Sequence, residues 1–292
     1  MTPAPGTRIA VLTDLHVAEA GTPDSRWIGT LPLGRSQELV SAGVRLVAGL
    51  TPDGVALLGD LSQDGTDAQL DLLRGELPAL SRPVWAVPGN HDLGRVADPL
   101  RRLAGAVTAP NPVGTGWRGL HVAAGRLVRV PGEGGPTGWG GYREGAAPEV
   151  DGWPLDRPVL WLTHFPVIGL RAEVTAGGFP YAGDMTNRED VLAALVRHPG
   201  PVVVLAGHLH LRATAVHGSV LQLSHPALIE PPHQVTLLEV DPGPAGDGVR
   251  VARRCFALTD GPGPGLVPPQ EAWTYQGGEW RPEVVATGQA EA

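Results

Sequence analysis

The chain has 292 residues, enough to bury a substantial hydrophobic core in one large domain or two small ones. Its formal charge is −8, from 22 basic residues, all of them arginine, against 30 acidic ones. This acidic balance argues against nonspecific binding to nucleic acid or to an anionic membrane surface. No apolar run approaches the ~18 residues that suggest a membrane span, and the first seven residues lack the pattern of a signal peptide.

Cys255 is the single cysteine, which excludes an intramolecular disulfide and fits a reducing compartment. It falls within the strand-like run 249–258, so we expect a small core residue there. Because a single cysteine fits a reducing compartment, we expect a cytoplasmic protein. The sequence gives no indication of the oligomeric state.

The first hundred residues alternate between apolar runs typical of buried strands and segments with helical periodicity. Predicted strands cover Ile9–Leu12, Val55–Leu58 and Val84–Val87. Predicted helices cover Ser36–Leu50, Asp67–Leu77 and Val96–Leu103. Such strand–helix–strand units build parallel sheets, which bind ligands beyond the carboxyl ends of their strands.

The middle of the chain is rich in glycine and proline. Gly119–Ala123 and Arg126–Val130 flank Ala124-Gly125, a pattern that predicts a hairpin opening a second sheet. The segment 134–145 contains Trp139 and Tyr142 but has no periodicity, so we expect a loop.

Further strands follow in the second half of the chain. The predicted strands are Val159–Thr163, Val202–Ala206, Ala213–Val216, Val220–Leu223 and Val235–Val240, and the last three are expected to close the second sheet. A helix is predicted over Asn187–Arg197. Gly277-Gly278 lies in the middle of 273–280 and suggests one more hairpin, and the last ten residues are expected to fray.

Polar side chains follow five of the buried runs, at the point where each predicted strand ends. These side chains are Asp14, His16, Asp60, Asn90, His91, Asp92, His164, His208 and His210. His208 and His210 alternate, so on an extended chain both imidazoles point the same way. Two separated groups of strands around one such cluster predict an α/β fold, a four-layer α/β/β/α sandwich of two mixed β-sheets flanked by helices.

The order of these motifs resembles the calcineurin-like metallophosphoesterase family: Asp-x-His, Gly-Asp, Gly-Asn-His-Asp, a solitary His and Gly-His-x-His. The pattern is closest to bacterial enzymes similar to class III cyclic-nucleotide phosphodiesterases. It runs from about Arg8 to Val240. We therefore expect a metallophosphoesterase domain over residues 1–260 and a C-terminal extension over 261–292, with the hairpin and the frayed tail.

The resemblance implies two bound metal ions that share Asp60. One ion would take Asp14, His16, Asp60 and His210, and the other would take Asp60, Asn90, His164 and His208. Oxygen and nitrogen ligands without a thiolate admit divalent or trivalent Mn, Fe, Zn or Co. In the family the His91 position contacts the phosphoryl group or protonates the leaving oxygen, and Asp92 is expected to orient His91 through a hydrogen bond. The histidines outside the motifs are read as structural: His121, His198, His217, His225 and His233.

The expected activity is hydrolysis of phosphodiester bonds in a small substrate, with a nucleotide as one candidate, by attack of metal-bound hydroxide. Phosphoprotein phosphatases of the family have two arginines that would match the extra charge of a monoester, and here Asp64 and Pro88 stand in their places. A phosphomonoesterase, either a phosphoprotein phosphatase or a nucleotidase, is the alternative. A non-catalytic interaction module is less favoured, because every expected ligand is present.

Overall fold

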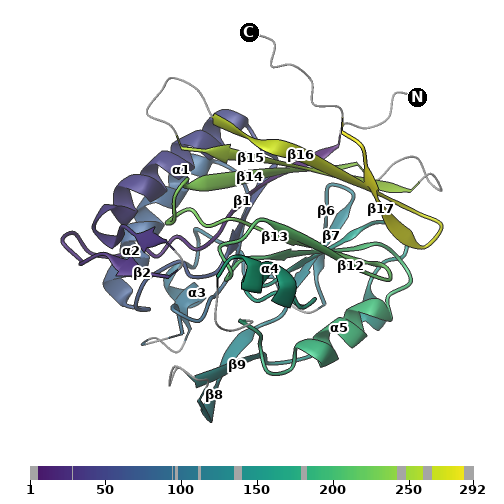
Figure 1. The fold of residues 1–292 in the computed structure, drawn as a ribbon, viewed down its shortest axis with the longest axis horizontal. Helices are drawn as coiled ribbons and strands as arrows, with labels where there is room; N and C mark the ends of the chain where they lie inside the picture. The colour runs from purple at the N-terminus through teal and green to yellow at the C-terminus, as the bar shows by residue number, and fades with distance from the viewer. Residues whose placement is uncertain are drawn as a thin grey trace.

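The fold consists of two large β-sheets packed face to face, with helices on the outer face of each (Figure 1). The computed structural model describes residues 6–27, 29–93, 95, 98–110, 113–134, 140–178, 183–241, 248–258 and 265–285. This arrangement confirms the predicted four-layer α/β/β/α sandwich. Within these residues, no helix is long and apolar enough to cross a membrane.

The first sheet has seven strands in the order β17-β16-β15-β14-β1-β4-β5. Their bounds are β1 Thr7–Leu12, β4 Gly54–Leu58, β5 Val84–Val87, β14 Gln234–Asp241, β15 Val249–Ala257, β16 Gly265–Gln276 and β17 Glu279–Glu283. β1, β4 and β5 run parallel, so their carboxyl ends share one edge of the sheet. Helices α1 (Ser36–Leu50) and α2 (Asp67–Glu76) cover its outer face.

The second sheet has six strands in the order β12-β13-β11-β10-β7-β6. Their bounds are β6 Thr115–Trp117, β7 Leu120–Ala124, β10 Val159–Leu162, β11 Val202–Ala206, β12 Ala213–His217 and β13 Val220–Ser224. β7, β10, β11 and β13 are parallel. Helix α5 (Arg188–Val196) packs on the outer face, and α4 (Arg171–Ala176) lies closer to the strand ends.

Side-chain alternation explains the layers. In β1, Ile9 and Val11 pack between the two sheets, whereas Ala10 and Leu12 pack against the helices. Both faces of each central strand are therefore covered by apolar side chains. This is why these strands appear in the sequence as continuous apolar runs.

The predicted hairpin around Ala124-Gly125 is wrong. β7 is buried along its whole length and enters the second sheet between β10 and β6. The chain then leaves that sheet, and β8 (Leu127–Gly134) pairs with β9 (Gly140–Glu144). An apolar strand with two sheet neighbours buries more surface than the same strand in an isolated hairpin. The loop expected over 134–145 is thus partly a strand, and Trp139 lies outside the described residues.

Two further expectations change in detail. Val235–Val240 lies in β14, which pairs with β1 and so belongs to the first sheet. The helix expected from Val96 is shorter: α3 spans Pro99–Arg102, and Asp98 caps it by accepting the backbone N–H of Arg101 at 3.3 Å. Val96 itself is not among the described residues.

The C-terminal strands complete the first sheet. β16 and β17 pair around Gly277 and Gly278, whose φ angles of 63° and 87° suit a two-residue turn, where the sequence predicts a hairpin. Trp273 and Trp280 from these strands are buried in the layer between the sheets. Cys255 in β15 is fully buried, as predicted. Residues 286–292 are outside the described part of the chain.

The remaining elements are short. They are β2 Ser25–Arg26, β3 Thr30–Leu31, η1 Leu33–Arg35, η2 Leu77–Leu80 and η3 Val150–Gly152. β2 and β3 pair with each other in the segment after Asp14 and His16, which the sequence suggests is a loop.

Candidate metal centre

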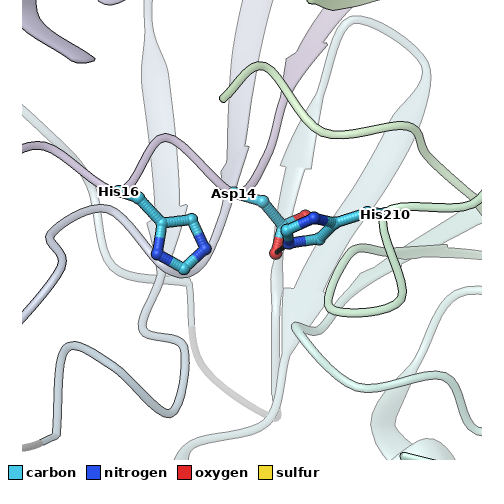
Figure 2. Close-up of side chains that lie close together, drawn as sticks. All are labelled: Asp14, His16 and His210. Atoms are coloured by element: carbon cyan, nitrogen blue, oxygen red, sulfur yellow. Dashed lines mark ion pairs between the residues drawn. The ribbon is translucent and has the colours of Figure 1, made fainter. Parts of the chain in front are cut away.

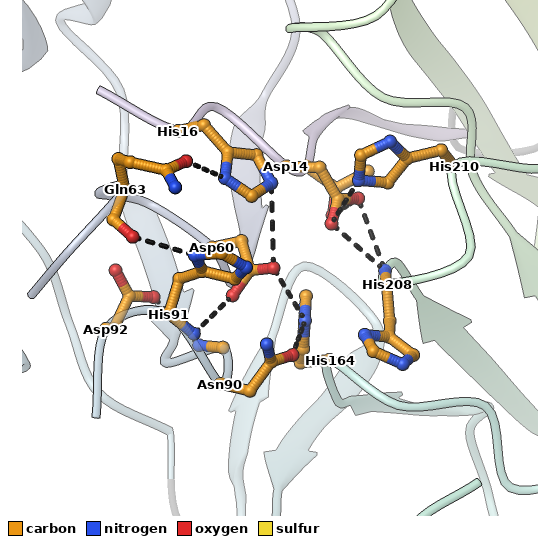
Figure 3. Close-up of polar contacts among 12 residues, drawn as sticks. Asp14, His16, Asp60, Gln63, Asn90, His91, Asp92, His164, His208 and His210 are labelled. Carbon is orange, nitrogen blue, oxygen red and sulfur yellow. Dashed lines mark hydrogen bonds and ion pairs between the residues drawn. The ribbon is translucent and has the colours of Figure 1, made fainter. Parts of the chain in front are cut away.

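The carboxyl ends of strands from both sheets meet at one place, and the polar motifs gather there (Figure 3). β1, β4 and β5 of the first sheet are followed by Asp14, His16, Asp60 and Asn90. β10 and β11 of the second sheet are followed by His164, His208 and His210. All seven sequence-predicted ligands are therefore brought together from segments far apart in the chain.

Five of these residues have a left-handed backbone conformation, which is uncommon for residues other than glycine. Their φ angles are 53° for Asp14, 43° for His16, 47° for Asp60, 68° for His208 and 54° for His210. Such conformations cost of order 1–3 kcal/mol each and cluster at functional sites. The surrounding sheets hold these turns so that the side chains point inward.

Asp60 lies at the middle of the cluster. Its Oδ2 atom is 3.6 Å from Nε2 of His16 and 3.3 Å from Nε2 of His164. Nε2 of His164 also lies 3.1 Å from Oδ1 of Asn90. One group of close candidate ligand atoms comprises Asp60, His164 and His208, and another comprises Asp60, His16 and His91. Asp60 is thus the carboxylate common to both sides of the cluster.

Asp14 is the second carboxylate, on the side of His16 and His210 (Figure 2). Its Oδ1 atom is 3.4 Å from Nε2 of His210. The hydroxyl of Thr13 donates to Oδ2 at 2.7 Å, and the backbone N–H of His208 donates to both oxygens at 3.2 Å. These bonds hold the Asp14 carboxylate against the loop that follows β11.

The histidines have the hydrogen bonds expected of metal ligands. Nδ1 of His16 lies 2.9 Å from Oε1 of Gln63, and Nδ1 of His164 lies 2.7 Å from the carbonyl of Leu58. An acceptor at Nδ1 places the ring hydrogen there and leaves the Nε2 lone pair free for an ion. Nε2 of His16 is buried and has no hydrogen-bond partner among the residues that the structure describes. The donor set therefore fits a pair of metal ions.

Two glycines allow the loops to approach each other. A Cβ atom on Gly59, whose φ is 87°, would lie 2.5 Å from Nδ1 of His164. A Cβ atom on Gly89 would overlap the backbone nitrogen and the carboxylate of Asp60. Any larger residue at either position would push the ligand loops apart.

Opposing effects set the pKa values of the two carboxyls. Burial raises the pKa of Asp60, but His164, His91 and His16 outweigh it and hold the pKa well below its usual range. Burial also raises the pKa of Asp14, and His210 more than reverses this change. Both groups are therefore anionic at neutral pH and ready to bind cations.

The imidazoles fall into two classes. Burial lowers the pKa of His208 to about 3, and burial with the nearby His91 lowers that of His16 to about 4. Burial also acts on His164 and His210, but the carboxylates of Asp60 and Asp14 raise their pKa values to about 9 and about 10. Because a ligating imidazole is neutral, binding of an ion at His164 and His210 would be coupled to release of protons.

His91 and Asp92 differ from the expected arrangement. The Asp92 carboxylate accepts the backbone N–H groups of Leu61 at 3.0 Å, Ser62 at 2.8 Å and Gly89 at 2.8 Å, and the Ser62 hydroxyl at 2.7 Å. It thus joins the loop after β4 to the loop after β5, and none of these four bonds goes to the His91 ring. Burial and the nearby carboxylate of Asp60 raise the pKa of Asp92.

His91 is oriented by a backbone carbonyl. Its Nδ1 atom lies 2.7 Å from the carbonyl oxygen of Gln63, and its backbone N–H donates to Oδ1 of Asp60 at 2.9 Å. The candidate ligand atoms of His91, His16 and Asp60 all lie within 4.8 Å of one another. His91 is therefore near enough to act on a substrate or on an ion.

Sequence reasoning missed two residues of the centre. Oε2 of Glu230 accepts from Nδ1 of His210 at 2.8 Å, and Gln63 supports both His16 and His91. Gln63 stands three residues after Asp60, which is a weak local signal. Glu230 belongs to no motif, so nothing in the sequence indicates its contact.

The histidines outside the motifs belong to none of the groups of close candidate ligand atoms found among the described residues. Nε2 of His121 lies 2.8 Å from the carbonyl of Val113, and Nδ1 of His225 lies 3.2 Å from the hydroxyl of Thr236. His217 is exposed on β12. These contacts agree with the structural roles expected for them.

Two comparisons relate the sequence of this chain to known proteins. The family model for calcineurin-like phosphoesterases matches residues 7–212. A protein of Synechococcus sp. named "Probable cyclic nucleotide phosphodiesterase" is 27% identical over 221 residues, covering 75% of this chain and 79% of the relative.

Two solved structures share the fold. A dimetal phosphatase from Danio rerio has a TM-score of 0.61 at 16% identity and covers 88% of this chain and 98% of its own. A purple acid phosphatase from yellow lupin has a TM-score of 0.55 at 14% identity, over 92% of this chain and 55% of its own. With its motifs matched over most of its length, the chain belongs to the calcineurin-like phosphoesterase family.

Proposed function

We propose that the protein is a dinuclear metal-dependent phosphodiesterase for a small substrate, with a nucleotide as the leading candidate. Asp14, His16, Asp60 and His210 would hold one ion, and Asp60, Asn90, His164 and His208 the other. Bound ions of Mn, Fe, Zn or Co would polarise the phosphoryl oxygens, acidify water and stabilise the leaving oxygen. The observation that supports this best is the shared position of Asp60 between the two groups of ligands.

In this proposal His91 is the proton donor to the leaving oxygen. Gln63 holds the Nδ1 atom through its carbonyl oxygen at 2.7 Å, which leaves Nε2 as the atom that can give up a proton. Asp92 is a positioning residue, because its four hydrogen bonds hold the loops that present Asp60 and His91.

Charge supports a diester as the substrate. Two divalent ions, the carboxylates of Asp14 and Asp60 and one hydroxide leave a single positive charge, which matches a diester monoanion. The groups that lower the pKa values of these carboxyls are all histidines. Asp64, which replaces the phosphatase arginine, is exposed and accepts from Nε2 of Gln69 at 3.0 Å. The name of the Synechococcus relative points to diesters as well.

The test compares two chromogenic substrates under one set of conditions. The protein is loaded in turn with Mn²⁺, Fe²⁺, Zn²⁺ and Co²⁺, and kcat/KM is measured for bis(p-nitrophenyl) phosphate and p-nitrophenyl phosphate. We expect the diester to have the higher kcat/KM with the most active metal. A clear preference for the monoester would favour a phosphomonoesterase, and no turnover of either ester would favour an interaction module.

We place the protein in the cytoplasm. Cys255 has a fully buried free thiol and no second cysteine with which to form a disulfide within the chain. Proteins of reducing compartments rarely contain disulfides, which supports this proposal. Fractionation of the native cells with an antibody would test this location.

A further inference from the structure

A cavity of about 800 Å³ lies at the carboxyl end of β5. Pro88 and Leu93, which line it, stand directly before and after the Gly89–Asp92 motif. The other walls come from the end of β5, from α3 and the segment after it, and from the start of β8. Pockets of this size suit small organic ligands.

The hairpin of β8 and β9 borders this cavity with three consecutive residues of β8, Leu127, Val128 and Arg129. Cross-strand pairing sets Leu127 opposite Glu144 and Arg129 opposite Tyr142. Leu127 and Glu144 are buried, so this is the inner face, because residues two apart on a strand share a face. Arg143 is the cross-strand partner of Val128 on the opposite face, and its side chain is exposed and does not line the cavity.

Tyr142 connects this inner face to the metal centre. Its hydroxyl lies 3.4 Å from the carbonyl oxygen of Asn90, and its ring stacks on Phe165 with the centroids 5.9 Å apart. Tyr142 thus contacts the Asn90 loop and is also the cross-strand neighbour of Arg129.

The cavity combines apolar walls with an excess of positive charge. Its charged lining residues are Arg101, Arg126, Arg129 and Asp98. Arg126 is 3.9 Å from Asp98, whereas Arg129 has no ion pair or hydrogen bond with any residue that the structure describes. Arg129 is therefore available to bind an anion from outside the protein. Its planar guanidinium can form two parallel hydrogen bonds to a phosphate.

We propose that this cavity holds the leaving-group part of the substrate and that Arg129 binds a second phosphate carried by that part. The inference rests on the proposed phosphodiesterase function and narrows its substrate class. The apolar walls would take a nucleoside, and the arginine would take its phosphate. The preferred substrates are then linear diesters that carry a terminal phosphate.

The kinetic test uses two adenine dinucleotides, ApA and its 5′-phosphorylated form pApA. The readout is the ratio of kcat/KM for pApA to that for ApA within each variant, so changes in folding or metal loading cancel. One charge-assisted contact corresponds to roughly a tenfold preference or more for pApA in the unmodified protein. Arg129→Ala should bring the ratio to within about twofold of unity. The matched control Arg143→Ala, on the outer face, should keep the original ratio.

Equal rates for ApA and pApA in the unmodified protein would overturn the inference. So would an Arg129→Ala variant that keeps the preference for pApA, or an Arg143→Ala variant that loses it equally. Each result is read as a ratio, so partial loss of activity does not obscure it.

A binding measurement separates this inference from the proposed function. Saturation-transfer NMR on the full chain in EDTA compares AMP with adenosine. We expect stronger saturation transfer to AMP than to adenosine in the unmodified protein. Arg129→Ala should abolish this difference, and Arg143→Ala should retain it. Equal transfer to AMP and adenosine counts against the cavity assignment. If AMP binding depends on Arg129 but no diester is hydrolysed with any metal, the cavity assignment stands and the proposed function fails.

Discussion

Glu230 and His210 form a carboxylate–imidazole pair, with Oε2 of Glu230 2.8 Å from Nδ1 of His210. The other carboxylate oxygen of Glu230 accepts the backbone N–H of Gly29, in the turn between β2 and β3. Glu230 therefore fixes the orientation of a candidate metal ligand and also attaches a neighbouring loop to the centre. Partners of this kind raise the basicity of the ligating histidine.

Glu230→Gln should weaken metal binding without unfolding the protein. Loss of the carboxylate partner of a ligating histidine typically costs roughly 10- to 100-fold in metal affinity. Metal affinity would be measured by competition with a chromogenic chelator. Glu239→Gln, on the surface of β14, is the control, since Glu239 pairs with Arg254 away from the centre. Equal affinities in all three proteins would show that Glu230 has no role in the metal centre.

Asp60→Asn should lower the content of both ions and the activity together. The reason is that Asp60 is close to ligands on both sides of the cluster, 3.6 Å from His16 and 3.3 Å from His164. Elemental mass spectrometry of the protein after gel filtration would measure its metal content and check this outcome. A variant with two ions and full activity would rule out the bridging role.

His91→Ala should keep both ions while kcat falls by roughly 100-fold or more, the scale of a lost acid catalyst. His217→Ala, an exposed histidine on β12, should behave like the unmodified protein. Metal content and kcat are measured on the same preparations. Loss of one ion from His91→Ala at neutral pH would instead make His91 a metal ligand, in agreement with its proximity to His16 and Asp60.

Glu144 should make stability depend on pH. Burial raises its pKa from 4.5 to about 7, although the Thr163 hydroxyl 3.1 Å away opposes this change. Because the folded state holds the proton more tightly, the stabilisation is complete below pH 4.5 and is lost as the pH rises through 7. The whole effect is at most about 3 kcal/mol.

Urea unfolding of the unmodified protein and of Glu144→Gln would measure this difference. The variant keeps a neutral side chain at every pH, so its free energy of unfolding should exceed that of the unmodified protein at pH 8, and the gap should close toward pH 4.5. Other titrating groups, including the metal ligands, act on both proteins and cancel in the difference. A gap that is constant with pH would mean that Glu144 does not titrate in this range.

The sequence by itself determined most of the buried strands, helix α1 and the positions of the candidate ligands along the chain. Helix α1 has the predicted bounds Ser36–Leu50, because its apolar residues repeat with the period of a helix turn. Asp60 is predicted as a metal ligand because it follows an apolar run, Val55–Leu58, that stops at Gly59. Both signals are local: they depend on residues a few positions apart.

Only the tertiary structure decided which segments are neighbours. β7 has the sequence of a buried strand, but its partners β10 and β6 were selected by packing in the second sheet. The bond from Asp92 to the loop after β4 and the bond from Glu230 to His210 join residues 20 or more positions apart. Local sequence fixes backbone preference and side-chain alternation, whereas the partner of a strand or a carboxylate depends on how the whole chain buries its apolar surface.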